Sequence, residues 1–521
     1  MHAKLAPATV FIPLPVPVTS HTETELEPDI CWQAMHSRDA RFDGRFFVAA
    51  VTTGIYCRPI CPVPFAKPNN IALFPCAAAA EAAGYRPCRR CHPESSPGTP
   101  AWLGTSAVVS RALRLIWEGA LDASSVDELA ERVGIGSRQL RRLFIQHLGV
   151  PPIKIASTHR VHFARSLIEQ TDMPMAEIAL NAGFSSLRQF NHAVRTIAGQ
   201  SPTDLRRLRD KSAVSSRRGE FVMRLLYRPP FDWPALVAFL RSRATPGVEL
   251  VQDTSYQRTI ESDGGAGVID VRHDQQNACL IVRIALPKYR GLLRAVERIR
   301  RVFDLAADPL QIAGHLSHDS KLKPLLDSHQ GLRVPGVWDG FEVAVRAALG
   351  QRLTVVDSNL LAGKLVRKFG RPIETSIDGL THLFPRPEDL AGAELTPLGI
   401  SRESTGSIQA LARALCNKEF TFESFRTLQE TISRLSAMDG VGEEMAHYIA
   451  MRACGEPDAF PLDYRSLRCG MWKGEIPTSG EQLRRLAEEW RPWRAYAAMH
   501  LLLATEGGVV TEGAANYDAH S

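Results

Sequence analysis

The stretches FVAAVTTGIYCRPICP (47–62) and AAAAEAAGYRPCRRCHPE (77–94) contain four cysteines in two closely spaced pairs. Three residues separate the cysteines of the first pair, two separate those of the second, and 26 residues lie between the pairs. Two such pairs can place four thiolates at the corners of a tetrahedron, which is the geometry of a structural zinc site. The pattern therefore predicts a Zn²⁺ site made by Cys57, Cys61, Cys88 and Cys91.

The size of the chain and its use of cysteine agree with a metal site. The chain has 521 residues, which is enough for three to five domains at about 100–200 residues each. Six of the ten cysteines fall in the first 91 residues, and no export signal precedes them, which favours metal binding over disulfides. No run of about 20 uninterrupted apolar residues occurs, so we expect no transmembrane helix and a cytoplasmic protein.

Positive charge is concentrated in a few places. The net charge is only +6, from 62 basic and 56 acidic residues. Arginines cluster, however, in SRQLRRLF (137–144), DLRRLRDK (204–211) and SSRRGE (215–220). Clustered arginines on helices favour a polyanion such as DNA, although any single run is more typical of a solvated helix face.

The cysteine-bearing stretches resemble the N-terminal methyl-phosphotriester domain of the Ada family, over about residues 28–96. In that family all four cysteines bind zinc, and the first also accepts a methyl group from a damaged DNA phosphate. The resemblance assigns this catalytic role to Cys57. Methylation turns a thiolate into a neutral thioether, so the cluster would lose one negative charge and repel DNA phosphates less. A purely structural zinc site is the alternative.

Two similar helical units follow, ELAERVGIGSRQLRRLF (128–144) and IALNAGFSSLRQFNHAV (178–194). Each combines a short helix, a turn containing glycine and a polar second helix, as a helix-turn-helix requires. Together they resemble the AraC-type DNA-binding domain over about residues 105–210, which implies recognition helices near 136–146 and 185–196. The implied DNA contacts are Ser137, Arg138, Arg141, Ser186, Arg188 and Asn191, each with a solvated surface role as the alternative.

The segment LSAMDGVGEEMAHYIAMRACGEPDAFPLDYRSLR (435–468) contains a third motif. Gly440 and Gly442 form a tight loop between two helices with apolar faces, and such a loop can present backbone N–H groups to a DNA phosphate. The segment resembles the helix-hairpin-helix DNA glycosylases, whose catalytic aspartate corresponds to Asp463. The lysine of their lyase relatives is Glu444 here, so we expect neither a Schiff base nor a lyase step.

Three further stretches narrow this likeness to the AlkA family of 3-methyladenine glycosylases. They are YRPPFDWPALVAFLRSRA (227–244), WDGFEVAVRAALGQRLTV (338–355) and EEWRPWRAYAAMHLLL (488–503). The resemblance implies a base pocket that contains Phe239 and Tyr448 and a DNA wedge at Arg352 and Leu353. Glu444 and Leu502 stand where the family has tryptophans, which weakens the cation–π argument for binding cationic bases.

We therefore expect a multidomain, predominantly α protein with α+β parts. The expected units are a small zinc-binding α/β domain (26–98), an all-α double helix-turn-helix domain (105–210), an α+β AlkA-like N-terminal domain (219–325) and an all-α helix-hairpin-helix glycosylase domain (326–508), with tails at 1–25 and 509–521. The expected partners are double-stranded DNA and RNA polymerase, and the expected state is a monomer.

Three hypotheses remain open at this point. In the first, the chain fuses an alkylation sensor and transcription activator with a monofunctional glycosylase that excises 3-methyladenine. In the second, it senses alkylation and regulates transcription, but the glycosylase domain is weak or inactive. In the third, the zinc is structural and the chain is an ordinary AraC-type regulator. A Pro-Cys-His-Arg motif is absent from the sequence, so we expect no guanine-alkyl transfer.

Overall fold

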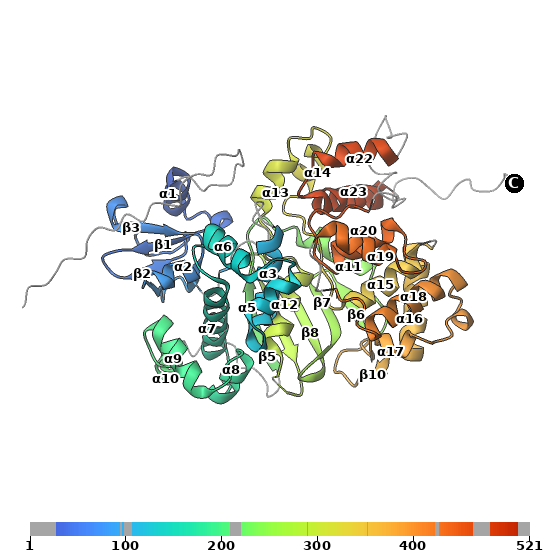
Figure 1. Cartoon of the computed structure of the whole chain (residues 1–521), viewed down its shortest axis with the longest axis horizontal. Coiled ribbons are helices and arrows are strands. Elements are labelled where there is room, and N and C mark those ends of the chain that lie inside the picture. The colour runs from blue at the N-terminus through green and yellow to red at the C-terminus, as the bar shows by residue number, and fades with distance from the viewer. Residues whose placement is uncertain are drawn as a thin grey trace, which may run out of the picture.

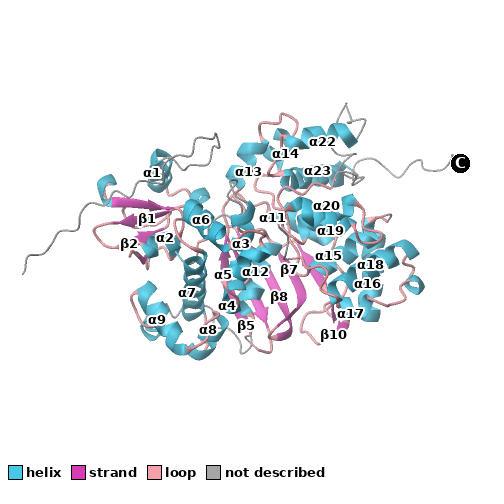
Figure 2. Cartoon of the chain, in the orientation of Figure 1, coloured by secondary structure: helices cyan, strands magenta, loops and turns pink. Residues whose placement is uncertain are grey.

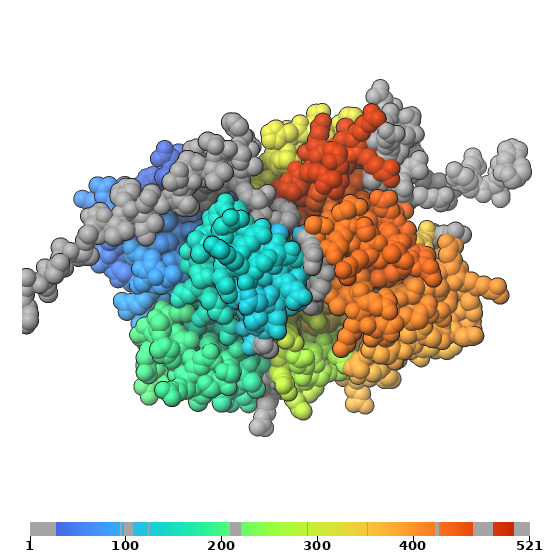
Figure 3. Space-filling model, in the orientation of Figure 1, coloured from blue at the N-terminus to red at the C-terminus, as the bar shows by residue number. Residues whose placement is uncertain are grey.

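The structure is a computed structural model that describes most of the chain (Figure 1). Residues 28–93 lie at one end and the C-terminal helices lie at the other end, with a five-stranded sheet in the middle (Figure 1). In the space-filling view, residues of the helix-turn-helix region also lie between these two ends (Figure 3). Among the described residues, no helix is long and apolar enough to cross a membrane. The described residues are 28–93, 96–97, 107–208, 220–288, 290–351, 353–422, 427–461 and 480–508.

The first domain is a four-stranded sheet with one helix on each face. The strands lie in the order β3 (Ile71–Phe74), β1 (Phe47–Ala50), β2 (Ile55–Cys57), β4 (Arg86–Pro87), and α1 (Pro28–Ser37) and α2 (Ala77–Ala82) complete the domain. β1 is antiparallel to both of its neighbours, whereas β2 and β4 are parallel. Because side chains alternate along a strand, Val48 packs with the α1 side and Phe47 packs with Tyr56 and Ala80 of the α2 side.

The second domain consists of helices only, as expected (Figure 2). The helices are α3 (Ala107–Trp117), α4 (Ala120–Ala123), α5 (Val126–Arg132), α6 (Ser137–Leu148), α7 (Pro152–Gln170), α8 (Met175–Asn181), α9 (Leu187–Ala198) and α10 (Pro202–Arg207). The two turns depend on Gly134 and Gly183, whose φ angles of 79° and 78° lie in the left-handed region that favours glycine. The predicted recognition helices correspond to α6 and α9, and the long helix α7 connects the two units.

The third unit is an antiparallel five-stranded sheet of order β5-β9-β8-β7-β6. Its strands are β5 (Glu220–Leu226), β6 (Glu249–Gln252), β7 (Ser255–Ser262), β8 (Gly265–Asp274) and β9 (Cys279–Ala285), and its helices are α11 (Trp233–Ser242) and α12 (Leu292–Val302). Ile269 and Val271 of β8 and Val282 and Ile284 of β9 are fully buried. These apolar residues alternate with more exposed ones, as in a sheet with one covered face.

The C-terminal unit packs its helices around one hydrophobic core that also receives Phe239 from α11. Its helices are α13 (Pro309–Leu316), α14 (Lys323–Ser328), α15 (Gly340–Gly350), α16 (Val355–Phe369), α17 (Pro387–Leu390), α18 (Arg402–Cys416), α19 (Leu428–Ser436), α20 (Glu443–Arg452), α22 (Gly480–Glu488) and α23 (Arg494–Gly508). A short ladder of β10 (Arg371–Pro372) and β11 (His382–Leu383) lies beside them. The hairpin between α19 and α20 is the motif that the glycines predict.

Candidate functional site

The four cysteines come together because of the register between β2 and β4. Tyr56 pairs with Pro87, and the Cys88 amide donates to the Tyr56 carbonyl oxygen at 2.9 Å. Cys57 and Cys88 are the next residues after this pair, so their side chains start close together. Cys61 and Cys91 follow after short turns and complete the cluster. The four Sγ atoms all lie within 4.8 Å of one another.

This cluster fits a bound Zn²⁺. Hydrogen bonds with the neighbouring thiols, of which the bond with Cys61 has the largest effect, raise the pKa of Cys57 far above its usual value. The hydrogen bond with Cys57 in turn lowers the pKa of Cys88. Four sulfurs this close cannot all be thiolates unless a cation compensates their charge. A tetrahedral set of four cysteine thiolates is a characteristic zinc coordination sphere.

The four sulfurs differ in exposure and in hydrogen bonding. Cys61 is fully buried and Cys88 and Cys91 are each 7 % exposed, whereas Cys57 is only partly buried. The Arg58 and Arg90 amides donate to Cys91 Sγ and Cys88 Sγ, each at 3.4 Å, and the Val63 amide donates to Cys61. In the described part of the chain, no backbone N–H donates to Cys57 Sγ.

A buried network connects the cysteine-bearing strand to the helix-turn-helix domain. The Tyr56 hydroxyl donates to Glu81 Oε1 at 2.9 Å, and the Thr158 hydroxyl of α7 donates to Glu81 Oε2 at 2.6 Å. His162 Nε2, also on α7, lies 2.9 Å from Glu81 Oε1. Burial opposes ionisation of Glu81, but His162 and the two hydroxyls lower its pKa, so the carboxylate is the favoured form.

The predicted DNA contacts lie on or beside α6 and α9, the two predicted recognition helices. Arg138 and Arg141 of α6 and Arg188 of α9 are exposed, and Asn191 is half-buried. The Ser186 hydroxyl accepts from the Gln189 amide at 3.2 Å and caps α9, so it has a structural task, and Ser137 is the first residue of α6. Arg142 and Arg195 are also exposed on these helices. Sequence reasoning missed these two arginines, although helical spacing from Arg138 and Arg188 would have found them.

The hairpin glycines have different geometries. Gly440 has a φ of 72°, and a Cβ there would lie 2.1 Å from Ser407 Oγ. Gly442 is the N-cap of α20 with an ordinary φ of −74°. The side-chain amide of Gln351 donates to the Gly440 carbonyl oxygen at 3.2 Å, so the end of α15 contacts the hairpin. Leu353, two residues after Gln351, is 41 % exposed. Arg352 lies outside the described residues, and so do the tails 1–25 and 509–521.

Asp463 also lies outside the described residues, but the loop that leads to it is described as far as Pro461. Arg494 Nε donates to the carbonyl oxygen and to Oδ1 of Asp458, at 3.0 and 2.8 Å. The Phe460 amide donates to His447 Nδ1 at 3.2 Å. Sequence reasoning did not identify His447, Asp458 or Arg494, because single polar residues in helices and loops give no local signal of a distant partner.

The predicted base-pocket aromatics lie against one arginine. The guanidinium carbon of Arg452 is 5.0 Å from the ring centre of Phe239 and 5.8 Å from that of Tyr448, and Arg452 donates to the Tyr448 hydroxyl at 2.9 Å. Arg243 lies 3.9 Å over the Phe239 ring. Phe239 is completely buried and Leu502 is almost completely buried, whereas Glu444 is half-buried in the first turn of α20.

Comparisons with known families agree with this arrangement. Family models match the metal binding domain of Ada at residues 30–94, a helix-turn-helix domain at 129–208 and the AlkA N-terminal domain at 222–339. The fold and the cysteine cluster thus define a multidomain protein that binds Zn²⁺ and DNA.

Three curated proteins illustrate the similarity along the chain. The "Probable bifunctional transcriptional activator/DNA repair enzyme AlkA" of Mycobacterium tuberculosis is 40 % identical over 482 residues, which cover 91 % of this chain and 96 % of that protein. The DNA-3-methyladenine glycosylase 2 of Escherichia coli is 30 % identical over 287 residues, 54 % of this chain and 97 % of that enzyme. The "Bifunctional transcriptional activator/DNA repair enzyme Ada" of Escherichia coli is 30 % identical over 191 residues, 37 % of this chain and 52 % of that protein.

The extent of the first match decides the family. This chain belongs to the family of bifunctional AlkA/Ada transcriptional activators and DNA repair enzymes.

Proposed function

We propose that the chain carries out three linked functions in the response to DNA alkylation. Cys57 accepts a methyl group from a DNA methyl phosphotriester, the methylated protein activates transcription with RNA polymerase, and the C-terminal half hydrolytically excises alkylated purines of the 3-methyladenine type. The proposed units are 26–98, 105–210, 219–325 and 326–508, acting within one monomer.

The observation that carries the first function is the exposure of Cys57 compared with its three buried partners. Amide hydrogen bonds stabilise a thiolate and reduce its nucleophilicity, and the three other sulfurs receive them. Bound Zn²⁺ would keep the sulfurs deprotonated near neutral pH. Cys57 thus combines access to DNA with the most nucleophilic sulfur of the cluster.

The transfer balances as a simple displacement. The Cys57 sulfur attacks the methyl carbon, an S–C bond forms, the C–O bond of the phosphotriester breaks, and the phosphodiester leaves with a negative charge. The phosphotriester itself is neutral, so it does not repel the anionic sulfur. Nothing regenerates the thiolate, so each protein molecule reacts once.

For base excision, the carboxylate of Asp463 would stabilise positive charge on the sugar and orient the attacking water. The bond between C1′ and the base nitrogen breaks, and the cationic base leaves as a neutral base with the bonding electrons. Water forms the new C1′–O bond and releases one proton to the solvent. An alkylated purine is cationic and needs little protonation to depart, and base flipping exposes the bond. Glu444 in place of a lysine supports a hydrolytic reaction without a lyase step.

One observation supports a second candidate, a regulator with a weak or inactive glycosylase. Glu444 and Leu502 occupy positions where the AlkA family has tryptophans, and Leu502 is 1 % exposed within the core. This removes aromatic surface that would bind a cationic base.

A single assay separates the two candidates. Purified full-length protein is incubated with methylated duplex DNA, and released 3-methyladenine is measured beside Asp463→Asn. Release that is lost in the variant supports excision by this chain. No release by the wild type, while Cys57 still becomes methylated, supports the regulator.

A further inference from the structure

The turn after α20 is held partly by a helix of the helix-turn-helix domain. This turn, Cys454–Pro461, is the described part of the loop that leads to Asp463. Arg111 of α3 makes a paired contact with Glu456, from Nε to Oε1 and from Nη2 to Oε2, each at 2.9 Å. Arg111 is 7 % and Glu456 is 3 % exposed, so this ion pair is largely shielded from water.

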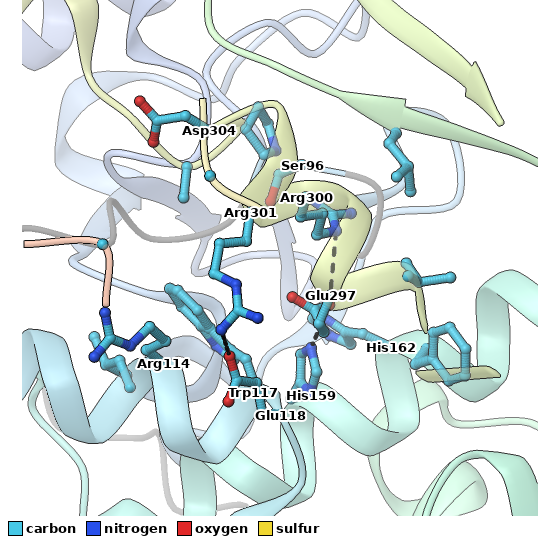
Figure 4. Close-up of a pocket in the computed structure, with 18 of the residues that line it drawn as sticks. Ser96, Arg114, Trp117, Glu118, His159, His162, Glu297, Arg300, Arg301 and Asp304 are labelled. Carbon is cyan, nitrogen blue, oxygen red and sulfur yellow. Dashed lines mark hydrogen bonds and ion pairs between the residues drawn. The ribbon is translucent and has the colours of Figure 1, made fainter. Parts of the chain in front are cut away.

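A second arginine of α3 strengthens this contact. Arg114 donates to the carbonyl oxygen of Cys454. Gly455, next in the chain, has a φ of 61°, and a Cβ on it would lie only 3.0 Å from Arg114 Nη1. The turn therefore adopts a left-handed conformation that brings its backbone close to α3. Glu118, just after α3, also contacts Arg301 of α12 at 2.6 Å (Figure 4).

Within its own domain, the same turn is fixed at later positions. The Ala495 amide donates to the Pro457 carbonyl oxygen at 2.9 Å, Arg494 binds Asp458, and His447 accepts from the Phe460 amide. The contacts of α3 at residues 454 and 456 thus hold the first part of the loop, and the glycosylase helices hold the second part.

Two residues of these contacts, Arg114 and Glu456, border a cavity. This cavity of about 260 Å³ is lined among others by Arg114, Trp117, Glu297 and Glu456 (Figure 4). Beside this cavity, discrete polar contacts from Arg111 and Arg114 connect α3 to the turn. Removing Arg111 would leave Glu456 buried without its cation, and a buried unpaired carboxylate tends to move toward water.

We propose that Arg111, assisted by Arg114, is a positioning residue for base excision, because a helix of the regulatory half holds residues 454 and 456 at the start of the segment that leads to Asp463. This inference rests on the proposed glycosylase function. A displacement of about 1 Å at a reacting group can cost up to about 100-fold in rate. Arg111 is buried and contacts the C-terminal half through Glu456, so its effect should appear in the rate of bond cleavage rather than in DNA binding.

The test uses full-length protein with four changes: Arg111→Ala, Arg111→Lys, the exchange Arg111→Glu with Glu456→Arg, and the control Arg241→Ala. Arg241 forms an exposed ion pair with Asp253 on the central domain. The measurements are the single-turnover release of 3-methyladenine, the affinity for undamaged duplex DNA, the melting temperature and methyl transfer to Cys57.

We expect Arg111→Ala to slow release at least about tenfold, Arg111→Lys to slow it less, and the exchange to restore much of the rate. DNA affinity and Cys57 methylation should stay within about twofold, as in Arg241→Ala. Release by Arg111→Ala at the wild-type rate would overturn the inference, as would loss of rate and melting temperature together without recovery in the exchange. Absence of release in the wild type would instead refute the proposed glycosylase function.

Discussion

At the scale of single residues, Cys57 differs from the exposed cysteine Cys416 at the end of α18, which has no partner cysteines for a metal among the described residues. If the metal cluster activates the sulfur, exposure alone should not make a cysteine a methyl acceptor. Cys57→Ala should therefore abolish transfer from methyl-phosphotriester DNA, while Cys416→Ala should still accept one methyl group per molecule. Peptide mass mapping after reaction measures both, and a methyl group found on Cys416 or on another cluster sulfur would contradict the assignment.

His447 makes the stability of the C-terminal domain depend on pH. Burial, followed by the charges of nearby arginines, lowers its pKa from 6.5 to about 4, and its Nδ1 must stay unprotonated to accept from Phe460. The unfolded chain binds this proton near pH 6.5, but the folded chain resists it. The stabilising contribution is therefore complete above about pH 6.5 and decreases as the pH falls toward 4, by about 2 kcal/mol between pH 6.5 and pH 5.

The measurement is urea denaturation at pH 7 and pH 5, monitored in the helical domain. His447→Asn keeps an acceptor without the titrating group, so it should lose less stability between these pH values than the wild type. His500 is buried with a similarly lowered pKa and remains in both proteins, so part of the pH dependence should persist. Equal losses in both proteins would show that His447 is not responsible.

At the scale of elements, the hairpin between α19 and α20 offers a matched pair of glycines. Alanine at position 440 would need both a left-handed backbone and a shift of Ser407, so Gly440→Ala should lower the free energy of unfolding by at least about 1–2 kcal/mol. A Cβ at Gly442 would point into open space, with no neighbouring atom within 4 Å, and Gly442→Ala should cost only a few tenths to about 1 kcal/mol. Similar losses in the two variants, measured by chemical denaturation, would contradict this difference.

The elements that sequence could predict are those with a local pattern. The spacing of Cys57, Cys61, Cys88 and Cys91 predicts their cluster, because β2 and β4 need only pair once to bring them together. Gly134 and Gly183 predict the turns of the two helix-turn-helix units, because a tight turn between two helices needs a residue that tolerates a positive φ. The pair of Arg111 and Glu456, and the network of Glu81 with α7, join segments that are distant in sequence. Such contacts arise from the packing of whole domains, so no local periodicity or spacing in the sequence predicts them.

At the scale of the whole molecule, metal removal should affect more than the first domain. Without Zn²⁺ the cysteine strands lose their common ligand, and Tyr56 and Glu81 should lose their fixed positions beside Thr158 and His162. We expect a chelator to unfold the zinc domain and to speed hydrogen exchange in α7, while the five-stranded sheet stays protected. Unchanged exchange in α7 after the metal is removed would mean that the Glu81 network does not couple the two domains.

Methylation of Cys57 should also change the affinity of the whole protein for DNA, through its charge. Methylation removes one negative charge next to DNA, which is worth about 1 kcal/mol at close range, or about fivefold in affinity. We therefore expect methylated protein to bind promoter DNA about fivefold more tightly at low salt, with the advantage shrinking as salt screens the charge. Titrations at several salt concentrations, with the unreactive Cys57→Ala protein treated in parallel, measure this difference. An advantage that persists unchanged at high salt would point to a rearrangement transmitted through Glu81 and α7, because salt screening weakens a charge effect but leaves a change of shape in place.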